Sequence, residues 1–218
     1  MTGLDYHDKI AVLDLGADEN RFSPEFLDEV NAHLDTVLAD GATGLVTTAS
    51  GKFYSNGLDL DWLGANADRT SWYVSRVQAL FARVLTLPIP TAAALPGHAF
   101  GAGAMLAVAH DYRVMRADRG YFCFPEVDIH IPFTPGMAAL VQAKLSPKTA
   151  VASMTTGRRF GGADASAVDI VDATAGEGEV TTAAIAMLAP LGAKDQATLG
   201  AIKNTMFASA VAALTADS

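Results

Sequence analysis

Cysteine is nearly absent from the sequence. The 218 residues contain one, Cys123, so no disulfide can form within the chain. Such a chain suits a reducing compartment. The first ten residues, MTGLDYHDKI, carry charges early and lack the apolar core of a secretory signal. The last four residues, TADS, differ from the peroxisomal S-K-L signal. We therefore expect a cytoplasmic protein.

Basic residues are also scarce. The chain has 15 Lys and Arg against 24 Asp and Glu, and its formal net charge is -9. An acidic chain with scattered basic residues does not attract phosphates, so we expect no nucleic-acid partner. The composition still allows one local basic site for a small anionic ligand. Half of the residues are apolar, which predicts a globular protein, and the length fits one domain.

An uninterrupted transmembrane run is missing too. Residues 91–109, TAAALPGHAFGAGAMLAVA, are long enough to span a bilayer, but Pro96, His98 and several glycines interrupt them. We interpret this stretch as a buried strand, a loop and a helix. No association with a membrane is expected.

The sequence does contain alternating strand and helix patterns. Ser23-Pro24, Thr134-Pro135 and Ser146-Pro147 each place a hydroxyl residue before a proline, which indicates three helix starts. The alternation predicts an α/β protein with right-handed crossovers. The predicted strands are residues 9–15, 44–48, 91–95, 112–115, 121–124 and 168–171; further helices are predicted for residues 72–87, from the glycine-rich turn to Ala109, and for residues 181–214.

The glycine-rich turn contains Gly97, Gly101 and Gly103. It does not match a dinucleotide fingerprint, because no third glycine follows Gly103 at the required spacing. Two interpretations remain. The small residues could serve tight helix–strand packing, or the turn could expose N–H groups at a helix N-terminus, where they would stabilise an oxyanion. One such donor typically lowers a barrier by about 3 kcal/mol.

A second loop, residues 55–59 (SNGLD), could supply another exposed N–H group. Its Ser55 does not fit the nucleophile elbow G-x-S-x-G, because Phe53 occupies the position of the first glycine. This disfavours a serine hydrolase.

Glu126 is the candidate general base. It follows Pro125 within a markedly apolar segment. If the segment is buried, the pKa of this carboxyl should rise toward neutrality, as a general base requires. The alternative is an ordinary surface glutamate at a strand end. The surrounding apolar residues are Phe122, Phe124, Ile129, Ile131 and Phe133.

The remaining reactive residue types favour structural roles. His110-Asp111 and Asp128-x-His130 do not cluster at metal-ligand spacing, so no metal site is predicted. Cys123 lies in an apolar strand and is interpreted as core. Arg158-Arg159 is interpreted as a solvated pair.

Taken together, four segments resemble the crotonase superfamily, the enoyl-CoA hydratase/isomerase family. The first is similar to the family's first oxyanion loop, the second to its strand, second oxyanion loop and helix, the third to its catalytic PE segment, and the fourth to a later TG-R-x-F segment. In chain order they read GKFYSNGLDLDWL, PTAAALPGHAFGAGAMLAVAHDYRVM, FPEVDIHIPFTPGM and MTTGRRFGGADASAVDIVD. Within the family, YSNGLDL and AHDYRVMRADRG resemble the plant peroxisomal isomerases in particular.

The resemblance implies a β–β–α spiral core over residues 1–165, with the oxyanion loops and the catalytic glutamate, and a shortened helical C-terminal region over residues 166–218 that drives oligomerisation. It also implies a homotrimer or a dimer of trimers. The implied ligand is an acyl-CoA thioester, with no cofactor beyond the substrate's own CoA. Glu126 would be the catalytic carboxylate, and the backbone N–H groups of Leu58 and Ala102 would form the oxyanion hole. Ala102 occupies a position where the family usually has glycine.

One departure from the family pattern bears on the reaction. Hydratases of this family use two glutamates, and the second of these falls on Met105, which cannot transfer protons. A single carboxylate suits double-bond migration, so the sequence most resembles the Δ3,Δ2-enoyl-CoA isomerases. Substrate-binding roles are predicted for residues of both loops, the PE segment and one lysine, namely Lys52, Asn56, Gly57, Gly101, Met105 and Phe133.

Four further expectations concern two single residues and two alternative functions. Lys203 is considered for CoA binding but interpreted as a surface lysine, and Asp59 is expected to cap its loop. Another crotonase reaction, such as hydration, thioester hydrolysis or decarboxylation, stays open; hydration would need a second acid such as Asp128 or His130. A non-catalytic acyl-CoA-binding protein is the alternative from a different class.

Overall fold

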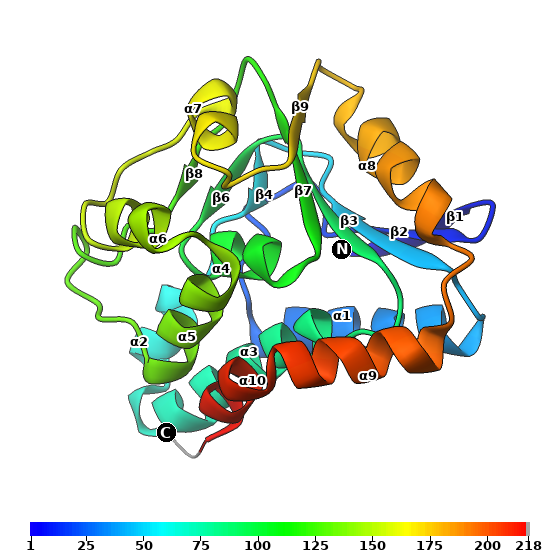
Figure 1. The fold of residues 1–218 in the computed structure, drawn as a ribbon. Coiled ribbons are helices and arrows are strands. Elements are labelled where there is room, and N and C mark those ends of the chain that lie inside the picture. Colours follow the sequence, from blue (N-terminus) through cyan, green and yellow to red (C-terminus); the bar gives the residue numbers. More distant parts are fainter. Residues whose placement is uncertain (217–218) are drawn as a thin grey trace.

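The computed structural model describes residues 1–216 and contains two β-sheets. In the larger sheet, β2 (Ile10–Asp14), β3 (Gly44–Thr48), β5 (Thr91–Leu95), β7 (Tyr112–Arg116) and β9 (Ala173–Ala175) run parallel, and β1 (Gly3–His7) pairs antiparallel with β2 at one edge. The strand order is β1-β2-β3-β5-β7-β9 (Figure 1).

The smaller sheet is parallel and has the order β4-β6-β8, formed by β4 (Phe53–Ser55), β6 (His98–Phe100) and β8 (Phe122–Cys123). Each of its strands directly follows a strand of the larger sheet: β4 follows β3, β6 follows β5 and β8 follows β7. The chain therefore winds through three successive spiral turns, and each turn contributes one strand to each sheet.

The short turns that join the two sheets stack on one another. A Cβ atom on Gly97 would lie 2.0 Å from the carbonyl oxygen of Lys52, and one on Gly120 would lie 2.8 Å from the backbone of Gly97. Gly120 also has a φ of +93°, which L side chains rarely adopt. Glycine at these two positions allows the spiral turns to approach this closely.

The helices begin where the sequence places hydroxyl caps. The side chains of Ser23, Thr134 and Ser146 each accept a hydrogen bond from the N–H group three residues later, and proline follows each of them. The helices are α1 (Pro24–Ala39), α2 (Leu60–Ala65), α3 (Thr70–Leu85), α4 (Ala102–Ala109), α5 (Pro135–Lys144), α6 (Pro147–Met154), α7 (Gly162–Ala167), α8 (Val180–Leu188), α9 (Gln196–Met206) and α10 (Ala208–Thr215), with 3₁₀ turns η1 (Ala67–Arg69) and η2 (Ala189–Leu191).

Alternating residues of β5 divide the core between the two faces of the larger sheet. Ala92 and Ala94 pack toward α8, together with Val180, Ala184 and Leu188. Ala93 and Leu95 face the main cluster, which includes residues of α1, α3 and α4. Helix α10 packs on α5 and α3, and α8 lies beside the strands of the larger sheet (Figure 1). Both faces of the central strands are thus covered, as expected for a parallel sheet.

Most predicted elements are present, and two are wrong. The last strand is β9, not residues 168–171: Asp169 adopts a φ of +57° in a turn after α7, and Ile170 and Val171 fill the core from this turn. Residues 181–214 do not form one helix. The chain breaks at η2, which contains Pro190, and bends by 73° between α9 and α10. Strands β1, β4 and β6 and helices α2 and α7 were not predicted.

Within residues 1–216, no single helix is both long and apolar enough to cross a membrane, although the bent pair α9–α10 passes on length and composition. In the same residues, no group of three or more His, Cys, Asp or Glu side chains could hold a metal ion. The predicted division after residue 165 stays a prediction, and the TADS ending reaches beyond the described residues.

Candidate active site

Three predicted site residues lie at one edge of the smaller sheet. Leu58 follows the end of β4 by three residues, Ala102 follows β6 by two, and Glu126 follows β8 by three. Because these strands are parallel neighbours, their carboxyl ends meet at the same edge. The spiral thus brings together residues that are far apart in the sequence.

Residues 55–59, here called the first loop, are held by the segment that precedes α1. The Ser55 hydroxyl donates to the backbone oxygen of Asn20 (2.8 Å) and accepts from the N–H of Gly57 (3.1 Å). The N–H of Phe22 in turn donates to the backbone oxygen of Gly57 (2.9 Å). The backbone of the first loop is therefore fixed on both sides of Gly57.

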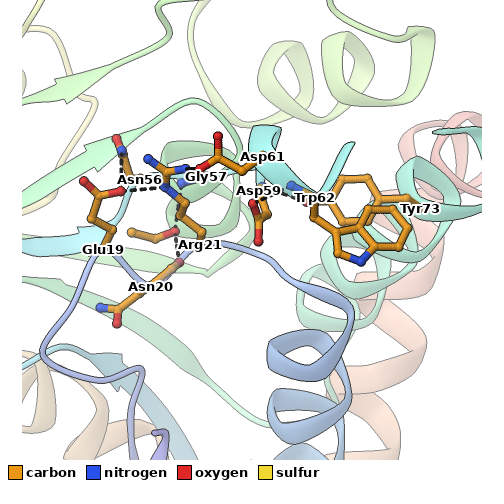
Figure 2. Close-up of polar contacts among 10 residues, drawn as sticks. Glu19, Asn20, Arg21, Asn56, Gly57, Asp59, Asp61, Trp62 and Tyr73 are labelled. Carbon is orange, nitrogen blue, oxygen red and sulfur yellow. Dashed lines mark hydrogen bonds and ion pairs between the residues drawn. The ribbon is translucent and has the colours of Figure 1, made fainter. Parts of the chain in front are cut away.

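Side chains reinforce this attachment, and Figure 2 shows those of Glu19, Arg21 and Asp61. The amide of Asn20, a buried residue with a φ of +50°, donates to the backbone oxygens of Gly16, Phe53 and Tyr54, each at 3.1 Å. Arg21 pairs with Glu19 and bridges to Asp61 in α2 at 2.8 Å. These contacts attach β4, which leads into the first loop, and α2, which follows it, to residues 19–21.

Asp59 caps α2, as predicted. Its carboxylate accepts from the N–H of Trp62 (3.0 Å), and its own N–H donates to the hydroxyl of Tyr73 (2.9 Å). The Tyr73 hydroxyl donates to the backbone oxygen of Phe22 at 2.7 Å, so α3 also fixes the first loop. Sequence reasoning missed Asn20 and Tyr73, because neither belongs to a motif with a recognisable spacing.

Residues 97–103, here called the second loop, end at the N-terminus of α4. Gly101 adopts a φ of +51°, and its N–H donates to the backbone oxygen of Cys123 (3.0 Å). Ala102 is the first residue of α4, where an N–H group has no intrahelical acceptor. Within residues 1–216, neither this N–H group nor that of Leu58 donates to another protein group.

The two loops are in direct contact. A Cβ atom on Gly57 would lie 2.9 Å from the amide nitrogen of Ala102 and 2.8 Å from the backbone oxygen of Phe100. One on Gly103 would lie 2.7 Å from the Cβ of Ser55. A side chain at residue 57 would therefore press on the Ala102 amide, so this contact between the loops requires glycine there.

Glu126 is buried beside the second loop. It is 8% exposed, and its Oε2 has no hydrogen-bond partner within residues 1–216. Its Oε1 would lie 3.4 Å from a Cβ atom placed on Gly101. Burial raises the pKa of the carboxyl to about 7, and a hydrogen bond from its own backbone N–H opposes the rise. The condition set for a raised pKa, burial of Glu126, is therefore met, although the neighbouring Ile129 and Ile131 are 46% and 37% exposed.

A mainly apolar cavity of about 480 Å³ opens beside Glu126. Phe133, one of the predicted substrate-binding residues, lines it. The remaining lining residues are Val127, His130, Ile131, Pro132, Met154 and Thr155. A cavity of this kind suits the apolar part of a ligand, with one carboxylate available to exchange a proton.

Other candidate residues lie elsewhere. Met105 is 1% exposed inside α4 and supplies no acid or base. Lys52 lies at the amino end of β4, opposite the edge that carries Leu58, and its ammonium contacts the Phe53 ring.

The prediction that Lys203 is a surface residue is wrong. It is 4% exposed and donates to Asp111 (2.6 Å) and to the backbone oxygen of Ile89 (2.8 Å), because α9 lies against the segments that lead into β5 and β7.

The structure gives His110 and Cys123 internal roles. The ring nitrogens of His110 contact the backbone oxygen of Leu106 (2.8 Å) and the hydroxyl of Thr47 (2.9 Å), and burial lowers the pKa of this imidazole to about 4. Cys123 is buried and donates to the backbone oxygen of Gly157, so its interpretation as core is confirmed.

The fold defines the class of protein. A spiral of paired parallel strands followed by helices is the crotonase fold, and the structure superposes on the human mitochondrial Δ3-Δ2-enoyl-CoA isomerase with a TM-score of 0.90 at 22% identity, covering 97% of this chain and 84% of that one. An enoyl-CoA hydratase/isomerase family protein from Pseudomonas syringae gives a TM-score of 0.93 at 26% identity over 99% and 94% of the two chains.

The sequence identifies the family. The model of the enoyl-CoA hydratase/isomerase family matches residues 6–218, and the chain belongs to this family of enzymes. It is 38% identical to the peroxisomal enoyl-CoA delta isomerase 2 of Arabidopsis thaliana over 82% of this chain and 79% of that protein. It is 39% identical to enoyl-CoA delta isomerase 3 of the same plant over 73% and 70% of the two chains.

Proposed function

We propose that this enzyme is a Δ3,Δ2-enoyl-CoA isomerase. The observation that carries the proposal is the desolvated carboxylate of Glu126. By the family resemblance, Met105, which cannot transfer a proton, stands where the hydratases have a second glutamate. A base with a pKa near 7 can both remove and return a proton at neutral pH. The delta isomerase names of the plant relatives support the same activity.

The proposed reaction moves one proton. The thioester oxygen accepts hydrogen bonds from the N–H groups of Leu58 and Ala102. Glu126 removes a proton from C2 of a 3-enoyl-CoA, and the electron pair delocalises to the thioester oxygen as a dienolate, which the two donors stabilise. Glu126 returns the proton to C4, and a 2-enoyl-CoA leaves. Only protein groups and the substrate take part.

Hydration of a 2-enoyl-CoA would require a second acid–base group to position water. The two candidates, Asp128 and His130, are both exposed, and His130 lines the cavity next to Glu126. An exposed side chain is poorly fixed in position, whereas a group that activates water must hold it in a defined place beside the substrate. This favours proton transfer within the substrate over hydration.

The proposal is tested by supplying 3-enoyl-CoA and 2-enoyl-CoA separately and following the absorbance of the conjugated thioester. An isomerase increases the signal from the first substrate and leaves the second unchanged. Glu126→Gln should reduce kcat by at least about a hundredfold, since acid–base catalysis contributes that much. Decay of the 2-enoyl-CoA signal would instead indicate hydration, and binding without turnover would indicate a non-catalytic acyl-CoA-binding protein.

The expectations of a homotrimer or dimer of trimers, of a cytoplasmic location, of a CoA contact by Lys52 and of a substrate contact by Asn56 stand as proposals beside this activity. Sedimentation equilibrium measures the first. Comparing the KM of Lys52→Met for a CoA thioester and for a pantetheine thioester measures the contribution of Lys52, because only the CoA ester carries the nucleotide phosphates.

A further inference from the structure

A second cavity, of about 510 Å³, lies beneath α9 and shares no lining residue with the cavity beside Glu126. Its floor is formed where β5 and β7 begin and where α5 ends, at Pro90, Asp111, Tyr112 and Lys144. The rest of its lining comes from the C-terminal helices and the turn between them, namely Leu191, Lys194, Asp195, Thr198, Leu199, Ile202, Lys203, Met206 and Phe207. Its volume lies within the range of small-molecule sites.

Most charges at this cavity are already paired. Asp111 accepts hydrogen bonds from the ammonium of Lys203 (2.6 Å) and from the N–H (2.8 Å) and hydroxyl (3.2 Å) of Thr91. Lys194 and Asp195 are exposed neighbours of opposite charge at the rim. None of these groups leaves a desolvated charge without compensation.

Lys144 is the exception. Within residues 1–216, its ammonium makes no hydrogen bond or ion pair. The ammonium nitrogen lies over the Phe207 ring, 5.2 Å from the ring centroid. A ring face attracts a cation but does not neutralise it. Burial, together with the positive charges of Arg113 and Lys203, lowers the pKa of Lys144 to about 8 despite the opposing effect of Asp111. The ammonium is therefore still protonated at neutral pH.

We propose that this cavity binds a monocarboxylate with an apolar chain, as in a free medium-chain fatty acid. The carboxylate would pair with the Lys144 ammonium, and the chain would lie along Leu199, Ile202 and Met206. One uncompensated positive charge matches one negative charge, which argues against a polyanion such as a CoA ester. Ile202 and Met206 are 55% and 70% exposed, so a bound chain would also cover apolar surface.

Calorimetric titration of the whole protein with decanoate tests this proposal, with decylamine as a probe of the same chain and opposite charge. Decanoate should bind at one site and decylamine should not. Lys144→Met should weaken decanoate binding by at least about tenfold, because it removes a charge-assisted hydrogen bond. Lys144→Arg should retain binding. Lys148→Met, which removes an exposed lysine of α6 outside the cavity, is the matched control and should bind as the wild type does.

Several results would overturn the proposal: equal binding of decylamine and decanoate, unchanged decanoate affinity in Lys144→Met, or no heat of binding up to about 1 mM decanoate, a concentration that corresponds to negligible affinity. If Lys144→Met fails to fold, Lys144→Gln replaces it. The alternative is that a second copy of the chain covers this surface. Sedimentation of the protein without decanoate shows whether the chain self-associates. If Ile202→Asp abolished self-association, and decanoate failed to bind the associated wild type, a second copy of the chain would occupy this surface and fatty-acid binding would be contradicted.

Discussion

Glu126 shows how the environment of one residue can serve a reaction and weaken the fold. Its carboxyl loses hydration on folding and gains no partner for Oε2 within residues 1–216. The ionised form is therefore less stable in the folded protein than in the unfolded chain, which raises the pKa from 4.5 to about 7. The protein holds a weak acid where a proton must be both removed and returned.

This shift predicts a specific pH dependence of stability. Between about pH 4.5 and 7 the folded protein keeps a proton on Glu126 that the unfolded chain has lost, so the free energy of unfolding should fall as pH rises through this window. Relative to Glu126→Gln, the wild type should lose about 3 kcal/mol between pH 4 and pH 8. Urea unfolding of both proteins at several pH values measures the difference. Parallel curves would show that the carboxyl does not titrate in this way.

Catalysis should have the opposite dependence on pH. Because the base must be ionised to accept the C2 proton, kcat/KM for a 3-enoyl-CoA should rise tenfold per pH unit below about 7 and level off above it. Initial rates at low substrate concentration report this profile. A limb centred near pH 4.5 would mean that Glu126 is solvated in the working enzyme.

At the scale of elements, the site depends on the contact between the first loop and the N-terminus of α4. Gly57 has a φ of +85°, and a Cβ atom there would press against the Ala102 amide. Gly57→Ala should therefore displace the second donor and reduce kcat by about a hundredfold, in addition to lowering stability. Enzyme kinetics and thermal unfolding together separate the two effects.

Gly178 provides a matched control for this substitution. Its φ is +77°, but no atom of residues 1–216 lies within 4 Å of its Cβ position, apart from its chain neighbours. Gly178→Ala should cause similar backbone strain, worth about 1–2 kcal/mol, with kcat unchanged. If both variants lost activity equally, general destabilisation would explain the loss, and the contact with Ala102 would not.

Local sequence signals account for much of these elements. The pairs Ser23-Pro24, Thr134-Pro135 and Ser146-Pro147 give three helix starts correctly, since capping depends on neighbouring residues only. The strand predicted at residues 168–171 fails because two apolar residues there fill the core from a turn. Apolar character reports burial more directly than backbone conformation.

At the scale of the whole molecule, Lys203 fastens the C-terminal helices to the larger sheet. Its ammonium reaches from α9 to Asp111 and to the backbone oxygen of Ile89. The sequence could not indicate this, because the contact joins residues 92 positions apart through a chain reversal that no local pattern records. Asn20 and Tyr73 escaped prediction for the same reason, whereas Glu126 could be found because its apolar neighbours adjoin it in sequence.

Removing this attachment should destabilise the fold. Lys203→Met leaves Asp111 without its counter-ion in a largely buried position and should lower the free energy of unfolding by about 3 kcal/mol. Adding Asp111→Asn should recover part of the loss, because no unpaired charge then remains. Lys194→Met, which changes an exposed lysine near the same helix, should alter stability by less than about 0.5 kcal/mol. Urea unfolding compares the four proteins, and equal effects of the two lysine substitutions would contradict this role.

The stacked spiral turns also restrict how the length of such a chain can vary. Leu58, Ala102 and Glu126 each follow a strand of the smaller sheet within a few residues, so inserting one residue into β4, β6 or β8 would shift one group by about 3.3 Å relative to the other two. The turns before these strands cannot grow easily either, because Gly97 packs on Lys52 and Gly120 packs on Gly97. Insertions and deletions should therefore accumulate in the longer crossovers, around α2 and η1 and around α6 and α7, where the chain can lengthen without moving any of the three groups.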